Sequence, residues 1–128
     1  MKKIVDFLYN IKSRERTLII VEGRRDKEAL NKMGIKNVYT IYELRKMENI
    51  FLDYKEAIIL TDNDKKGNKL YLYVKNILES EGLTINNYYR KKFFNIFKVK
   101  EVEDINKKID RILFYVNYFE NPEKILEI

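Results

Sequence analysis

The sequence predicts an α/β fold, with a mostly parallel sheet of about four strands and helices on both faces. Two short apolar runs, residues 17–21 and 57–60, are rich in β-branched side chains, which is typical of strands buried on both faces. Strand-like and helix-like segments alternate three times, which favours parallel strands joined by helical crossovers. Two of the four glycines, Gly34 and Gly82, follow helix-like segments, where a left-handed residue commonly ends a helix.

The first half of the chain is expected to begin with a short helix over residues 5–11. A polar connector then leads to the first strand, residues 17–22. Asp26 can cap the next helix, because its carboxylate accepts hydrogen bonds from the free amides of a first turn. That helix ends at Gly34. A second strand over residues 37–42 is followed by a helix to about residue 54, predicted from the spacing of Leu44, Met47, Phe51 and Tyr54.

The second half begins with the third strand, residues 57–60, and a helix over residues 68–81. We expect a fourth strand with an irregular extension between residues 82 and 100. An amphipathic helix over residues 101–120 follows, ended by Pro122. Its apolar stripe comprises Val102, Ile105, Ile109, Ile112, Val116 and Phe119. We predict one domain, residues 1–128, with the core fold over residues 17–100.

Composition narrows the chemistry. The 128 residues include 26 basic and 20 acidic side chains, a net charge of +6, which favours a polyanionic partner such as nucleic acid over a neutral one. A generic solubilising surface is the alternative. With no histidine and no cysteine, an ordinary zinc site and a Ser-His or Cys-His nucleophile are excluded. Any metal must therefore be held by oxygen, as Mg²⁺, Mn²⁺ and Ca²⁺ are.

Hydropathy predicts a cytoplasmic protein that does not enter the membrane. No apolar run approaches the ~20 residues that span a bilayer, and polar residues interrupt the N-terminal segment where a signal peptide would need an apolar run. The glycine census also excludes the GxGxxG and GxxxxGK phosphate-binding motifs.

Acidic residues follow two of the predicted strands. Glu22 and Gly23 come directly after the first, and Asp62, Asp64 and Gly67 follow the third. The carboxyl ends of parallel strands are where open α/β sheets bind their ligands. Like charges placed there repel unless a cation neutralises them. We therefore expect these strand ends to meet and hold a magnesium ion.

Other interpretations of the Asp62–Asp64 pair fit less well. A calcium loop of the EF-hand type needs a ligand at the position of Lys66 and a glutamate at that of Tyr73. A haloacid-dehalogenase-type phosphatase usually has a threonine or apolar residue where Lys65 stands. The chain is short for a sugar-nucleotide transferase. A pair of surface aspartates with a purely structural role is the remaining alternative.

The two acidic motifs together resemble those of the Toprim domain. The residues that carry the resemblance are Val21-Glu22-Gly23-Arg24-Arg25-Asp26 and Leu60-Thr61-Asp62-Asn63-Asp64-Lys65-Lys66-Gly67. The likeness is greatest to small stand-alone Toprim proteins of archaeal type. The chain is also similar to ribosomal-RNA maturation nucleases and to the Toprim domains of bacterial-type primases. The resemblance implies a three-layer, Rossmann-like Toprim fold.

The resemblance further implies Mg²⁺-dependent phosphodiester chemistry on DNA or RNA, with one or two ions and Mn²⁺ as a substitute. It makes Glu22 a general acid or base that also touches a metal, and Asp62 and Asp64 metal ligands. Asp26 is either a ligand, a group behind the ligands or a helix cap. A nuclease built this way uses water as its nucleophile. A partner subunit or a second copy of the chain could complete the site.

Basic residues supply candidate contacts to phosphates. Arg24, Arg25, Lys65 and Lys66 flank the acidic motifs. Arg90, Lys91, Lys92, Lys98 and Lys100 are interleaved with Tyr88, Tyr89, Phe93, Phe94 and Phe97 in a stretch that has no acidic residue. Such aromatics can stack on bases or pack in the core, and the sequence favours the core. A nuclease, a non-catalytic nucleic-acid-binding adaptor and a small-molecule phosphatase remain open.

Overall fold

The computed structural model describes residues 1–120, so Pro122, expected to end the last helix, lies outside the described residues. Twelve elements follow one another along this part of the chain: α1 (Lys2–Lys12), β1 (Thr17–Val21), α2 (Arg24–Lys32), β2 (Val38–Thr40), α3 (Ile41–Leu44), η1 (Ile50–Leu52), β3 (Glu56–Leu60), α4 (Lys65–Ser80), β4 (Thr84–Ile85), α5 (Tyr88–Phe97), η2 (Val102–Lys107) and α6 (Ile109–Glu120).

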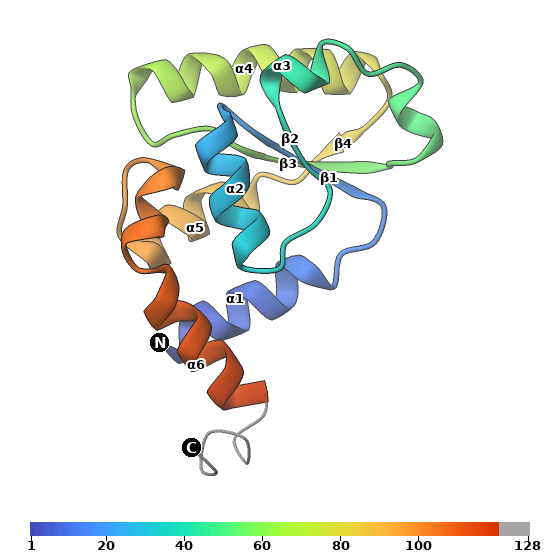
Figure 1. The fold of residues 1–128 in the computed structure, drawn as a ribbon. Coiled ribbons are helices and arrows are strands. Elements are labelled where there is room, and N and C mark those ends of the chain that lie inside the picture. Colours follow the sequence, from blue (N-terminus) through green and yellow to red (C-terminus); the bar gives the residue numbers. More distant parts are fainter. Residues whose placement is uncertain (121–128) are drawn as a thin grey trace.

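The four strands form one parallel sheet in the order β2-β1-β3-β4. β1 and β3 lie side by side over five residue pairs, from Thr17 opposite Glu56 to Val21 opposite Leu60. α3 and α4 cover one face of the sheet, and α1, α2, α5 and α6 lie toward the other (Figure 1). The α/β fold and the parallel sheet are thus as predicted. The predicted C-terminal helix is also present, but as an α-helix it begins at Ile109, because residues 102–107 form the 3₁₀ helix η2.

Alternating strand residues supply two cores. One face of the central strands contributes Ile19, Val21, Ile58 and Leu60 to a cluster with α1, α2, α5 and α6. The opposite face contributes Leu18, Ile20, Ala57 and Ile59 to a cluster with α3 and α4. Because both faces are covered, β1 and all but the first residue of β3 are buried, which is why these strands appear in the sequence as continuous apolar runs.

The helix predicted up to about residue 54 is wrong. α3 has four residues, and a separate 3₁₀ turn, η1, follows. Asn49 between them has φ +53°, a left-handed conformation that breaks a helix. As a result Phe51 is 52% exposed, and its neighbour Ile50 is buried instead.

The fourth strand is confirmed but has two residues, and the aromatic segment after it is a helix, not an irregular extension. Tyr89, Phe93 and Phe97 recur at helical spacing, and each packs edge-on or tilted against its neighbours around Phe7 of α1. The aromatics of α5 are therefore mainly core, with Tyr88, at 58% exposed, as the exception.

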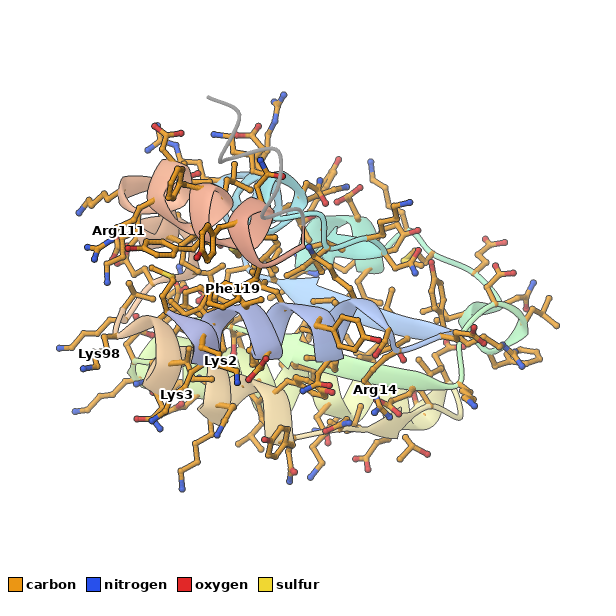
Figure 2. The ribbon with its side chains drawn as sticks, turned by 90° about the horizontal axis from the view of Figure 1, so that it is seen from below. Lys2, Lys3, Arg14, Lys98, Arg111 and Phe119 are labelled. Atoms are coloured by element: carbon orange, nitrogen blue, oxygen red, sulfur yellow. The ribbon has the colours of Figure 1, made fainter. Side chains whose placement is uncertain are left out.

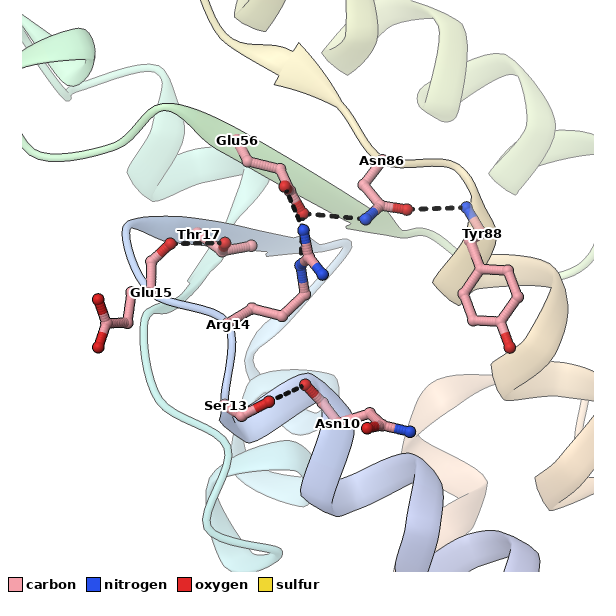
Figure 3. Close-up of polar contacts among 8 residues, drawn as sticks. All are labelled: Asn10, Ser13, Arg14, Glu15, Thr17, Glu56, Asn86 and Tyr88. Carbon is pink, nitrogen blue, oxygen red and sulfur yellow. Dashed lines mark hydrogen bonds and ion pairs between the residues drawn. The ribbon is translucent and has the colours of Figure 1, made fainter.

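A polar network ties the start of α5 to the sheet (Figure 3). Arg14 donates to both carboxylate oxygens of Glu56, at 2.8 and 2.6 Å. The Asn86 side-chain amide donates to the same carboxylate at 3.0 Å, and its oxygen accepts the Tyr88 N–H at 3.1 Å. Through Asn86, the backbone of Tyr88 is thereby tied to Glu56, the first residue of β3.

Of the helices within residues 1–120, none combines the length and the apolar character that crossing a membrane requires.

Candidate functional site

Glu22 and Asp62 meet at the carboxyl edge of the sheet. β1 and β3 are neighbours and end together, with Val21 opposite Leu60. Glu22 follows β1 at once, and Asp62 lies two residues beyond β3. The Asp62 backbone N–H donates to Glu22 Oε2 at 2.7 Å. The strand order reverses between β1 and β3, which is the point where open α/β sheets form their ligand-binding crevice.

A segment from the C-terminal part of the chain closes over this edge. The Asn63 N–H donates to the Lys100 carbonyl at 2.8 Å, and the Val102 N–H donates to Asp62 Oδ1 at 2.9 Å. The Glu103 N–H donates to Asp26 Oδ1 at 2.9 Å. We call residues 100–103 the strap. It is a part of the site that the sequence reasoning missed, and the acidic run that begins at Glu101 was the available signal.

Asp26 lies behind the two carboxylates. It was predicted to be the N-cap residue of the helix, but it is the third residue of α2, and Gly23 occupies the N-cap position. Its Oδ2 accepts the Gly23 N–H at 3.0 Å. Because its other oxygen accepts from the strap, Asp26 joins the β1–α2 turn to η2 with its side chain buried. Burial raises the pKa of Asp26 above its ordinary value, against the lowering effect of its two backbone donors.

Asp64 is turned to the start of α4. It is the N-cap residue, and its Oδ1 accepts the Gly67 N–H at 2.6 Å. α4 therefore begins at Lys65, three residues before the predicted start. Gly67 also accepts a hydrogen bond from the buried Thr61 hydroxyl at 2.7 Å. A Cβ on Gly67 would lie 2.6 Å from the carbonyl carbon of Asp62, so glycine is required for this close approach.

Among the carboxylates at this edge of the sheet, Asp62 has the most strongly raised pKa. Burial raises its pKa to about 8, and the adjacent carboxylates of Glu22 and Asp26 add to the effect, while the Val102 N–H opposes it. Among residues 1–120, no three potential ligand side chains of Asp, Glu, His or Cys are grouped so that they could hold a metal ion. The structure thus brings Glu22 and Asp62 together, with Asp26 behind them and Asp64 in a capping role.

Arg90 has a structural position that sequence reasoning did not foresee. It donates to the carbonyls of Thr61 and Asp62 at 3.0 and 2.6 Å and to Asn68 at 3.0 Å. Burial lowers its pKa from the ordinary value, although the carboxylates of the edge act in the opposite sense. Arg90 therefore joins α5 to the end of β3. The other predicted phosphate contacts are exposed: Arg24, Arg25, Lys65, Lys66, Lys91 and Lys92.

Comparisons with known proteins agree with this geometry. The family model described as "Toprim domain" matches residues 16–88. A UPF0292 protein of Methanocaldococcus jannaschii is 29% identical over 122 residues, 91% of each chain. A UPF0292 protein of Pyrococcus abyssi is 35% identical over 92 residues, 68% of this chain and 70% of that one. A solved structure from Aquifex aeolicus, 26% identical, superposes with a TM-score of 0.65 over 78% of this chain and 95% of that one.

Proposed function

The chain belongs to the Toprim domain family, and on that premise we propose that it is a Mg²⁺-dependent enzyme that hydrolyses phosphodiester bonds in nucleic acid. Family membership indicates a nucleic-acid-related, Mg²⁺-binding role. Hydrolysis, or a related phosphoryl or nucleotidyl transfer, is the finer step. The observation that supports it is the convergence of Glu22 and Asp62, 40 residues apart in sequence, at adjoining strand ends.

The donor chemistry of the edge suits Mg²⁺. This ion is usually bound by one or two carboxylates, with water and substrate phosphate completing its shell. Glu22 and Asp62 supply two carboxylates, and burial together with the neighbouring carboxylates raises the pKa of Asp62, so a bound cation would relieve their repulsion. We assign the ion, or Mn²⁺ in its place, to Glu22 and Asp62. Asp26 and Asp64 hold the surrounding backbone through their capping contacts.

The residues of the chain have distinct tasks in this proposal. Bound Mg²⁺ would neutralise charge on a phosphate and lower the pKa of a bound water. Glu22, oriented by the Asp62 N–H, takes or returns the proton of the attacking water. Arg90 fixes the carbonyls on either side of the Thr61–Asp62 peptide and keeps Asp62 aimed at Glu22. Because the sequence has no histidine or cysteine, Ser-His and Cys-His nucleophiles are excluded, and the proposal takes water as the nucleophile.

Cleavage of labelled single- and double-stranded RNA and DNA tests the proposal, with Mg²⁺, with Mn²⁺ and with EDTA. We expect Glu22→Gln and Asp62→Asn each to lower the Mg²⁺-dependent rate at least 100-fold, which is typical for loss of a proton-transferring group. Glu79→Gln and Asp53→Asn, at exposed positions, serve as matched controls. Wild-type cleavage that survives both site substitutions would refute the assignment.

A non-catalytic nucleic-acid-binding or adaptor module is the second candidate. It is favoured by the absence of a three-carboxylate group within residues 1–120. It predicts salt-sensitive binding that weakens when Lys91, Lys92 and Lys98 are neutralised, with no turnover under any divalent metal. The same cleavage assay therefore separates the two candidates.

A further inference from the structure

A groove of about 1070 Å³ opens beside the carboxylate edge. It lies between α4, which contributes Tyr71, and α5, which contributes Arg90, Lys91 and Phe94. Asn63, the residue between Asp62 and Asp64, is also one of its lining residues. Its size is at the upper limit for ligand pockets, so it accommodates more than a small metabolite. Through Asn63 the groove adjoins the segment that carries Asp62 and Asp64.

Arg90 and its contacts form the floor of the groove. The Arg90 guanidinium lies over the rings of Tyr71 and Phe94, with centroid distances of 5.3 and 5.9 Å. Its Nε and Nη2 groups donate to the carbonyls of Thr61 and Asp62, just after β3, and to Asn68, so these protein contacts hold Arg90 in the floor of the groove. The groove is therefore held open by contacts that are independent of a ligand.

Tyr88 is an exposed aromatic platform at the rim. Its side chain is 58% exposed, whereas Tyr89, the next residue, is 6% exposed. The two rings meet edge to face, with centroids 5.3 Å apart. Asn86 holds the Tyr88 backbone through the network that reaches Glu56 and Arg14 (Figure 3). An aromatic ring fixed in this way can stack on a base at a small entropic cost.

The charge of the groove suits a polyanion. Lys91 and Lys92 are its exposed cations, and none of its lining residues within the described part of the chain is acidic. Tyr88 and Lys92 also line a second hollow between α1 and α5, which two cations, Lys3 and Lys92, and one acidic residue, Asp6, border. Lys2, Lys3 and Lys98 extend from the ends of α1 and α5 on this side of the molecule (Figure 2). Cationic side chains therefore continue beyond the groove.

We propose that this groove binds an unpaired stretch of polynucleotide, stacks one of its bases on Tyr88, and leads its backbone past Lys91 and Lys92 toward Asn63. The choice of an unpaired strand follows from the aromatic rim, because a ring can cover the face of a base only where that base is not already stacked within a helix. The inference deepens the proposed function, because it assigns a substrate class to the same edge, but its test does not require turnover.

Binding to the full chain in EDTA tests the groove separately from catalysis. Fluorescence anisotropy is measured with labelled 12-nucleotide oligo-U and oligo-dT strands and with blunt duplexes of equal length. We expect both single strands to bind more tightly than the duplexes. Tyr88→Ala should weaken single-strand binding at least fivefold. Lys91→Gln with Lys92→Gln should reduce the slope of log K against log salt by about 1.4.

Tyr9→Ala with Lys55→Gln is the matched control, because it removes an aromatic ring and a charge at exposed positions outside both hollows. It should bind as the wild type does. Preference for duplex, no binding of single strands, or a Tyr88→Ala variant with unchanged affinity at an unchanged Tm would each overturn the groove assignment. Intact single-strand binding without any Mg²⁺-dependent cleavage would instead overturn the hydrolase proposal and leave the groove standing.

Discussion

Replacement of Gly67 by alanine should damage both stability and the site. The new Cβ would overlap the carbonyl oxygen of Asp62 and would lie 2.6 Å from its carbonyl carbon and 3.0 Å from its backbone nitrogen, whereas ordinary contact begins at 3.4 Å. Both sides of the contact are main chain, so no side chain can rotate away. The first turn of α4 must therefore move away from Asp62, which strains the Asp64 cap and the Thr61 hydrogen bond.

Two opposing effects set the change in the free energy of unfolding on Gly67→Ala. Overpacking a tight site costs about 1–3 kcal/mol, and more where the backbone must move. Alanine recovers about 1 kcal/mol of helix propensity. We therefore expect the free energy of unfolding to fall by about 2 kcal/mol, with a drop in Tm of roughly 6–10 °C for a chain of this size. Urea and thermal unfolding followed by circular dichroism measure both quantities.

Gly23→Ala is the matched control for this experiment, because its Cβ would meet Asp26 Oδ2 at 3.8 Å, an ordinary contact. We expect it to cost less than about 1 kcal/mol, as changes at an N-cap glycine do. The Gly67→Ala variant should also lose Mg²⁺-dependent cleavage at temperatures where it remains folded, because Asp62 is displaced. A Gly67→Ala variant within 0.5 kcal/mol of the wild type would refute the close-approach argument.

Two further predictions concern charge. Asp62→Asn keeps an oxygen for the Val102 N–H but removes the repulsion from Glu22 and Asp26. Without metal it should therefore raise the free energy of unfolding by about 1 kcal/mol, a figure discounted for partial exposure. In differential scanning fluorimetry, millimolar Mg²⁺ should raise the Tm of the wild type and not of the variant, and equal shifts would contradict a metal at Asp62. The contact with Arg14 lowers the pKa of Glu56 below its ordinary 4.5. The folded-state pKa is then below the unfolded one, so this stabilisation is complete above about pH 4.5 and is lost as the pH falls through the folded value. Glu56→Gln should lower the free energy of unfolding by about 1 kcal/mol at pH 7. In urea titrations between pH 3 and 7, the fall of this free energy toward low pH should be shallower for the variant than for the wild type. An unchanged fall would show that the pair does not contribute.

The central strands could be predicted because their environment is uniform. β1 and β3 are covered on both faces, so nearly every residue in them is apolar, and an acidic residue soon after each marks the carboxyl edge. Gly34 and Gly82 were likewise predicted to end helices as left-handed residues, and both have positive φ, at +84° and +88°. These features depend on local sequence and on the elementary rule that parallel strands end on the same side.

What the sequence did not reveal depends on tertiary contacts. The helix breaks at Asn49 because this residue has a left-handed conformation. Asparagine tolerates that conformation but does not require it, so the sequence alone does not predict the break. α5 was hidden because its aromatics fit a strand as well as a helix, and only packing against Phe7 selects the helical period. The strap over Asp62 and Asp26 is held by backbone amides of Val102 and Glu103, so the acidic run that begins at Glu101 marks the segment but not its backbone contacts.

The two outer strands of the sheet have a consequence for self-assembly. β2 has three residues and runs directly into α3, and β4 has two. An intruding strand needs a longer row of free backbone groups, so these stubs protect against edge-to-edge pairing and the aggregation that follows from it. A second copy of the chain would therefore have to dock through helical surfaces, such as the side of α6 that exposes Phe114 and Tyr118.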